Sequence, residues 1–182
     1  MRANRLVPAA MLFGAVVLAA GTASAADPTA PVKEIMTATE ANWAEDGSEF
    51  QNLFSEDRLN RLYSEEFVAL FRKASDNAFA QEAGTPFDYD VIVNAQDGCP
   101  LEDVTIKPQS SASGRTVVVA RFKSTTCFGD DPDFQKATET RFEVVEDGGH
   151  AVIDDIRTPD GDGGFSSLKN EMRTFAEFNT SN

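Results

Sequence analysis

The pattern of apolar and polar residues changes once along the chain, near residue 83. From about residue 32 to this point, apolar residues recur at spacings of three and four, which is the period of an amphipathic helix. Beyond it, apolar and β-branched residues alternate with polar ones, as in half-buried strands. The pattern predicts an α+β domain in which helices come first and a sheet follows.

Two helices are predicted before the change. The first covers residues 32–45 and ends at the turn Asp46-Gly47-Ser48. The second begins after Ser55, whose hydroxyl can accept a bond from a first-turn N–H, and runs to about Gln81, before Gly84. Its apolar stripe contains Leu59, Leu62, Tyr63, Phe67, Leu70, Phe71, Ala74 and Phe79. A stripe this aromatic is typical of core, and a ligand pocket is the alternative.

A first hairpin is predicted from residues 101–108 and 115–125, around the turn Ala112-Ser113-Gly114. If Ser111 faces Arg115, the register follows for the whole hairpin. It pairs Thr105 with Arg121 on one face and, on the other, Val104 with Phe122, Ile106 with Ala120 and Pro108 with Val118. The same register places Cys99 opposite Cys127. We therefore expect a Cys99–Cys127 disulfide in an oxidising compartment, with two reduced cysteines as the alternative.

A second hairpin is predicted from residues 137–145 and 150–157, around Asp147-Gly148. This register pairs Phe142 with Ile153, Val144 with Ala151, and Arg141 with Asp154 as a solvated ion pair. After a turn, Ser166 can cap a final helix that carries Leu168, Met172, Phe175 and Phe178. The predicted fold is two N-terminal helices packed on a curved four-stranded antiparallel sheet, with a C-terminal helix.

Residues 1–25 have the three parts of a secretory signal peptide. Arg2 and Arg5 form a basic start, residues 6–20 form an uncharged apolar run shorter than a membrane span, and Ala23-Ser24-Ala25 supplies small residues for cleavage after Ala25. An uncleaved anchor is the alternative. No cysteine lies near this junction for lipid attachment. We expect a flexible leader at residues 26–31, a single domain at 32–182, and a periplasmic or secreted protein without a membrane anchor.

Charge restricts the class of partner. Removing the signal peptide removes two Arg and no acidic residue, so 14 Lys and Arg stand against 30 Asp and Glu, a net charge of −16. Such a surface repels phosphate backbones and anionic lipid headgroups, which disfavours nucleic acid and membranes as partners. Acidity of this kind usually serves solubility. Attraction to a basic partner is the more specific alternative.

Metal, cofactor and nucleophilic chemistry find little support in the sequence. The run Asp160-Gly161-Asp162-Gly163-Gly164 lacks the later acidic ligand of a calcium loop, and Gly129-Asp130-Asp131-Pro132-Asp133 is a weaker candidate still, so no metal site and no cofactor are assigned. The only histidine, His150, lies beside a predicted turn, where we expect it to be exposed. Both cysteines are assigned to a bridge, so no catalytic residue is predicted.

Several short motifs resemble the DUF3828 family of small exported bacterial proteins. They are Pro86-Phe87-Asp88-Tyr89-Asp90, Asn94-Ala95-Gln96-Asp97, Val104-Thr105-Ile106 with Val117-Val118-Val119, and Val152-Ile153-Asp154-Asp155-Ile156 before Ser167-Leu168. The resemblance spans residues 35–178 and implies an NTF2-like or cystatin-like α+β fold. Ala151 stands where many members have a tryptophan, so one large packing group is absent. The family has no established catalytic residues to transfer.

The resemblance also suggests where a site could lie. Some NTF2-like families carry acid–base chemistry on an Asp and a Tyr inside the cone, and Tyr63, Tyr89, Asp90 and Asp97 are the residues of these types available here. The candidate pocket-lining residues are Tyr63, Phe67, Tyr89 and Asp97. The leading hypothesis is a periplasmic, non-catalytic binding module for an unknown protein or small ligand. The alternatives are an immunity- or inhibitor-like protein that neutralises a basic partner, and an NTF2-like enzyme.

Overall fold

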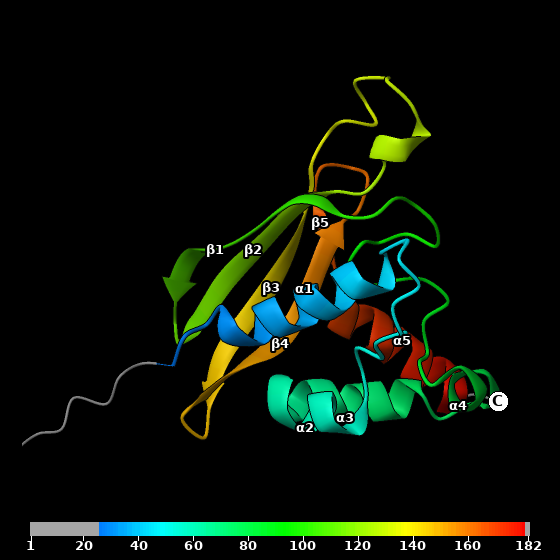
Figure 1. The fold of residues 1–182 in the computed structure, drawn as a ribbon. Coiled ribbons are helices and arrows are strands. Elements are labelled where there is room, and N and C mark those ends of the chain that lie inside the picture. Colours follow the sequence, from blue (N-terminus) through cyan, green and yellow to red (C-terminus); the bar gives the residue numbers. More distant parts are fainter. Residues whose placement is uncertain (1–25, 181–182) are drawn as a thin grey trace, which may run out of the picture.

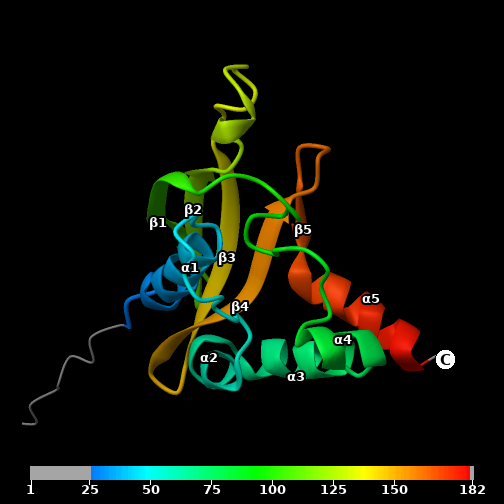
Figure 2. The ribbon, with the colours of Figure 1, turned by 45° about the vertical axis from the view of Figure 1, so that its right-hand side comes forward.

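The computed structural model describes residues 26–180, so the predicted signal peptide lies outside the described residues. The fold is α+β, with one antiparallel sheet and five α-helices (Figures 1 and 2). The helices are α1 (Ala30–Asn42), α2 (Glu56–Leu62), α3 (Glu65–Ala74), α4 (Ala78–Ala83) and α5 (Leu168–Thr180). The strands are β1 (Glu102–Ala112), β2 (Arg115–Lys123), β3 (Thr138–Asp147), β4 (His150–Pro159) and β5 (Phe165–Ser167).

The sheet has five strands in the order β1-β2-β3-β4-β5, where the sequence predicts four. The additional strand, β5, is three residues long and pairs with the end of β4. A strand this short is hard to recognise from alternation alone. It directs the chain into α5, which packs against α3. Among the described residues, no helix has the length and apolar character needed to cross a bilayer.

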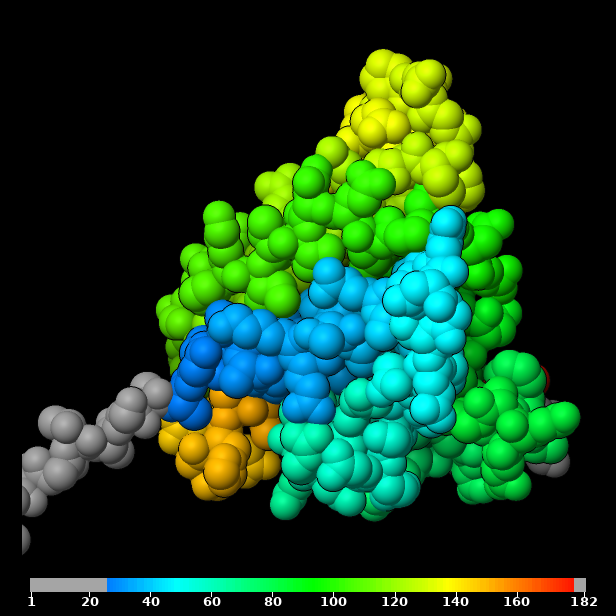
Figure 3. Space-filling view, in the orientation of Figure 1, coloured from blue at the N-terminus to red at the C-terminus, as the bar shows by residue number. Residues whose placement is uncertain are grey.

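The core lies between one face of the sheet and the helices, and α1 crosses that face (Figures 1 and 3). Alternate residues of the central strands are buried there because successive strand side chains point to opposite faces. The α1 side chains that recur at helical spacing meet them. The buried set includes Val32, Ile35 and Met36 from α1, and Val118, Ala120, Phe122, Phe142 and Val144 from β2 and β3.

The long helix predicted after Ser55 is three shorter helices. Ser55 caps α2 as expected, because its Oγ accepts a hydrogen bond from Arg58 N. The chain then extends at Tyr63 and Ser64, where Ser64 N donates to the carbonyl of Ile153 in β4 at 2.9 Å. This tertiary bond overrides the helical pattern, and the Ser64 hydroxyl caps α3. Gly84 ends α4 with a positive φ, as predicted.

The predicted register of the first hairpin is confirmed in its centre. Thr105 faces Arg121, Ile106 faces Ala120 and Pro108 faces Val118. A bulge between Pro108 and Ser110 then shifts the pairing, so that Ala112 faces Arg115 and the predicted Ser111–Arg115 pair is wrong. The ladder is also irregular between Glu102 and Thr105, where the sequence predicts Val104 opposite Phe122.

A disulfide joins Cys99 and Cys127 beyond the open end of this hairpin, and their Cα atoms lie 5.7 Å apart. A backbone hydrogen bond from Cys99 N to Ser124 O continues the pairing toward it. The cysteines are 28 positions apart in the chain. Closing a loop of this length stabilises the fold by about 3 kcal/mol in the chain-entropy model.

The predicted register of the second hairpin is wrong by two positions from the turn to Val144, and by three positions from Glu143 onward. The turn is Gly148-Gly149, so Asp147 faces His150 and Val144 faces Ile153, where the sequence predicts Phe142–Ile153 and Val144–Ala151. Both glycines have positive φ, 57° and 83°, which a two-residue hairpin turn needs and which would strain Asp147. His150 is exposed beside this turn, as expected.

A bulge in β4 changes the partner of Asp154. The register shifts between Glu143 and Val144, and the predicted Arg141–Asp154 ion pair is absent because Arg141 pairs with Glu139 instead. The Asp154 carboxylate, 8% exposed, accepts hydrogen bonds from Ser64 Oγ at 2.7 Å, Arg115 Nη1 at 2.6 Å and Lys169 Nζ at 3.1 Å. Asp154 therefore connects α3, β2 and α5.

These bonds decide the pKa of Asp154. Burial alone would raise the pKa, but the donors on Ser64, Arg115 and Lys169 outweigh it and hold the pKa of Asp154 below its ordinary value. The folded state therefore favours the carboxylate. The stability that Asp154 contributes is present above the unfolded-state pKa of about 3.9 and is lost as the pH falls below that value through the folded-state pKa.

We predict that Asp154→Asn destabilises the protein by about 3 kcal/mol at pH 7, because it takes the buried carboxylate away from Arg115 and leaves the buried Lys169 to pair with the exposed Glu66. Urea unfolding followed by circular dichroism measures this. The wild-type advantage should shrink as the pH falls from about 4 to 2. Asp133→Asn is the matched control, since Asp133 forms an exposed pair with Lys136, and we expect a change below about 0.5 kcal/mol. Equal losses in both variants would contradict the role of Asp154.

Candidate functional site

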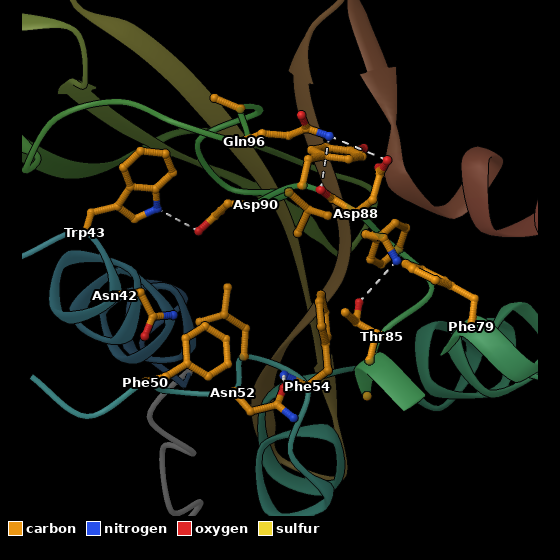
Figure 4. A pocket seen from close by; sticks show the side chains of 17 residues that line it. Asn42, Trp43, Phe50, Asn52, Phe54, Phe79, Thr85, Asp88, Asp90 and Gln96 are labelled. Carbon is orange, nitrogen blue, oxygen red and sulfur yellow. Dashed lines mark hydrogen bonds between the residues drawn. The ribbon is translucent and has the colours of Figure 1, made fainter. Parts of the chain in front are cut away.

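An apolar hollow lies between the end of α1, residues 50–54, α4 and residues 85–96, and we call it the aromatic groove (Figure 4). Its volume is about 510 Å³, within the range of small-molecule sites. Seventeen residues line it. Six of them are aromatic: Trp43, Phe50, Phe54, Phe79, Phe87 and Tyr89.

One wall is the segment after α1. The Asn42 side chain holds it in place, since its amide donates to the carbonyl of Gln51 at 2.9 Å and its oxygen accepts from Gln51 N at 2.6 Å. Asn52 supports the next turn by accepting from Phe54 N. Phe50 therefore stands on a fixed backbone although 75% of the residue is exposed. On the opposite side Phe79 projects from α4 and is 53% exposed.

The other wall is the tight turn of residues 88–96. The Asp90 Oδ1 atom accepts hydrogen bonds from Ile92 N at 2.8 Å and Val93 N at 3.0 Å, and Asp90 N donates to the carbonyl of Ala95. Ile92 and Val93 are buried, and Thr140 of β3 donates to the Ile92 carbonyl at 2.6 Å. The turn is thus anchored to the sheet, and the Asp90 carboxylate has a fixed position at the groove.

Trp43 connects the two walls. Its indole Nε1 donates to Asp90 Oδ2 at 2.8 Å, as Figure 4 shows. Behind the ring lies Gly98, where an added Cβ would stand 2.7 Å from Trp43 Cζ3 and 2.7 Å from the carbonyl of Ser124. Only glycine fits this approach, and the next residue is Cys99 of the disulfide. The indole is therefore confined from both sides.

The floor of the groove continues into the core as stacked rings. Phe54 and Phe87 are buried, and their centroids are 5.9 Å apart. Below them, Phe54 lies 5.7 Å from Tyr63 and 4.8 Å from Phe71, while Tyr63 stacks on Phe67 at 4.6 Å. This continuous aromatic packing makes the floor stiff, since none of these rings can move without displacing its neighbours.

The structure brings only part of the predicted site together. Tyr89 lines the groove, and its hydroxyl donates to Glu171 at 2.7 Å; burial and then this bond raise the pKa of Tyr89. Tyr63 lies below the floor with its hydroxyl donating to the carbonyl of Leu53, and burial raises the pKa of Tyr63. Phe67 is fully buried, and Asp97 is exposed and does not line the groove.

Sequence reasoning missed most of the groove. The helical pattern assigned Phe79 to the apolar stripe of a long helix, and Phe79 is in fact exposed. Phe50 lies between helices, where no periodicity applies. Asp88 and Asp90 belong to the short motif that carries the family resemblance, but the motif gives no direction for their side chains. An exposed aromatic residue is recognisable only once the fold places it beside others.

The groove is acidic. Asp88 and Asp90 line it, and none of its lining residues is Lys, Arg or His. Within residues 26–180, neither carboxylate takes part in an ion pair, and their hydrogen-bond donors are the neutral side chains of Trp43 and Gln96 and backbone N–H groups. The described residues contain no group of three or more His, Cys, Asp or Glu side chains arranged to hold a metal ion.

A second hollow differs in chemistry. It lies over Asp154 and Lys169 and is lined almost entirely by polar groups, with acids and bases in equal number. Its charges neutralise one another, as in the pairs Arg115–Glu143 and Lys169–Glu66. Because these ions hold the elements together, we assign this hollow to stability and the aromatic groove to function.

No family model matches the chain, and neither a curated protein nor a solved structure is detectably similar to it. The case for a function therefore starts from the geometry of the groove.

We predict that Gly98→Ala displaces the Trp43 indole, because the new Cβ meets the backbone of Ser124 and the ring together. Trp43 is the only tryptophan of the chain, so its fluorescence emission reports this directly. We expect a shift to longer wavelength and a lower melting temperature. Gly164→Ala is the control, because the atoms nearest to its Cβ belong to the exposed side chain of Asp160 and none to Trp43, so it should leave the emission unchanged. An unaltered Gly98→Ala spectrum would contradict the confinement of Trp43.

Proposed function

We propose that this protein is an extracytoplasmic, non-catalytic binding module that takes the apolar part of a small ligand into the aromatic groove. The observation that carries this proposal is the pair of exposed rings, Phe50 and Phe79, on opposite sides of a stiff aromatic floor. Exposed rings cost free energy in water, and a ligand that covers them recovers it. A preformed groove also binds with little ordering cost.

Location outside the cytoplasm is part of the proposal. The Cys99–Cys127 disulfide supports it, since such bonds persist in oxidising compartments. The basic, apolar and small-residue pattern of residues 1–25 supports export by a cleaved signal peptide. The DUF3828 resemblance, with its NTF2-like or cystatin-like fold, remains a proposal that the α+β order and the antiparallel sheet support.

An acid–base enzyme has less support. Tyr63, the tyrosine of the predicted constellation on the helical stripe, donates to a backbone carbonyl within the aromatic packing, and Asp97 lies apart from the groove. Tyr89 and Asp90 do share the groove, but Tyr89 is bonded to Glu171 and Asp90 to Trp43. Both are engaged in holding the walls, which favours binding over proton transfer.

We predict that the neutral fluorescent probe N-phenyl-1-naphthylamine binds the groove and gains intensity on binding. Phe50→Ala and Phe79→Ala should each weaken its affinity roughly three- to tenfold, because each removes apolar contact area. Both residues are exposed, so these variants should keep the wild-type melting temperature. Phe128→Ala, at a half-exposed ring outside the groove, is the control and should bind as wild type. Equal affinity in all four proteins would place the probe elsewhere.

A second candidate function is the neutralisation of a basic protein partner. It rests on residues 124–137, which project beyond the sheet in Figures 1, 2 and 3. The disulfide anchors this loop at Cys127, and Phe128 packs edge-on against Phe134. Asp130 and Asp131 are exposed on it. A rigid projecting loop with an exposed ring and negative charge suits a complementary basic surface.

For this second function we predict capture of a basic protein from periplasmic extract at 50 mM salt and its loss at 500 mM, because screening weakens exposed charge pairs. The Asp130→Asn, Asp131→Asn double variant should also lose the protein, while Phe79→Ala, in the groove, should retain it. Capture that resists salt and both loop substitutions would rule out neutralisation through this loop.

A further inference from the structure

We infer that the aromatic groove selects organic cations: ligands in which an ammonium group is joined to an aryl or alkyl body. This inference rests on the proposed function, since it assigns a charge class to the ligand of the same groove. Three features of the groove carry it. They are unpaired carboxylates, exposed aromatic faces, and the absence of any cationic side chain among the residues that line it.

Neither groove carboxylate has the Lys or Arg partner that the acidic residues in the ion-pair cluster around Asp154 have. Glu143, Glu66 and Asp154 all pair with Lys or Arg. Asp90 instead accepts bonds from two backbone N–H groups and the Trp43 indole, which fix its position and leave its negative charge without a counter-charge. A cation that enters the groove would supply the missing counter-charge to Asp90. The groove is partly shielded from water, so the attraction between the two charges is stronger there than in bulk solvent.

The aromatic lining favours an organic cation over a small hydrated ion. Trp43, Phe50, Phe79 and Tyr89 line the groove with aromatic rings, and the negative face of a ring attracts a nearby cation. An organic ammonium can place its apolar body on these rings while its charged end approaches a carboxylate, whereas a strongly hydrated metal ion has no apolar part to cover them. The volume of about 510 Å³ fits a small molecule of this type.

The field of the whole protein acts in the same direction. The mature chain carries a net charge of −16 on cleavage after Ala25, so cations are concentrated near its surface and anions are repelled. This general attraction does not by itself select a site. A cation preference that depends on Asp88 and Asp90 would show that the groove selects, and the experiment must separate the two effects.

The test uses three ligands with one body: 4-phenylbutylammonium, neutral 4-phenylbutanol and anionic 4-phenylbutyrate. Affinity is measured by isothermal titration calorimetry at low ionic strength, and Trp43 fluorescence reports occupation of the groove. We expect the cation to bind about tenfold or more tightly than the alcohol, the anion to bind weakest, and the cation's advantage to shrink in high salt. Any of the three ligands that binds in the groove should change the Trp43 emission.

Three variants locate the selectivity. Asp88→Asn alters an exposed side chain and should not affect folding. Asp90→Asn keeps one oxygen, which can accept the turn bonds from Ile92 N and Val93 N, but the amide nitrogen that replaces Oδ2 cannot accept the bond from Trp43. Each should bring the affinity for the cation several-fold closer to that for the alcohol. Asp88→Asn should in addition leave the affinity for the alcohol unchanged. Asp97→Asn removes the same charge from a nearby exposed position that does not line the groove, and it should bind as wild type.

The outcomes separate this inference from the proposed function. If the alcohol binds as tightly as the cation, the charge assignment is wrong and the groove remains an apolar site. If Asp97→Asn reduces the cation preference as much as Asp88→Asn and Asp90→Asn do, net charge explains the preference and the inference fails. If none of the three ligands binds, the proposed function of the groove fails as well.

Discussion

The bulge in β4 lets two consecutive aspartates both accept hydrogen bonds from the starts of the helices that pack beside this strand. In a regular strand Asp154 and Asp155 would point to opposite faces, and only one could serve the helices. With one extra residue, Asp154 accepts from Ser64 and Lys169, while Asp155 accepts from Ser167 Oγ at 2.6 Å and from Lys169 N at 3.1 Å. The starts of α3 and α5 are thereby fixed to the same strand, and α4, which carries Phe79 into the groove, follows directly from α3.

The sequence predicted the parts of the fold that depend on local alternation, and also the helix start at Ser55 and the helix end at Gly84, where the residue type allows one interpretation. The Cys99–Cys127 bridge and the central pairs of the first hairpin were predicted from a register anchored on Ser111 facing Arg115. That anchor pair is wrong by one position, but the bulge between Pro108 and Ser110 restores the predicted register in the centre. The second hairpin failed because Asp147-Gly148-Gly149 offers two overlapping turns, and only the strain at a positive φ chooses between them. The bulge at Asp154 left no sign in the apolar pattern.

The helical region shows the same limit of local patterns, which do not reveal tertiary contacts. Tyr63 and Ser64 fit the stripe of a continuous helix, yet a hydrogen bond from Ser64 N to Ile153 draws them into an extended conformation. Propensity is a weak preference that one tertiary contact can reverse. The groove depends on this break, because a continuous helix would not turn α3 and α4 into their observed positions. Tyr89 could be predicted as a lining residue from its motif, whereas Phe50 could not.

The rigidity of the groove and the stability of the fold come from neighbouring residues. Gly98 and Cys99 are adjacent in sequence, so the disulfide that closes the first hairpin also fixes the surface against which Trp43 packs. Trp43 in turn holds Asp90, and Asp90 closes the turn that forms one wall. Oxidising conditions, under which the disulfide persists, are therefore also the conditions under which the groove is best ordered. A groove assembled in this way has paid its ordering cost during folding, and its exposed rings and carboxylates are available for a ligand from the start.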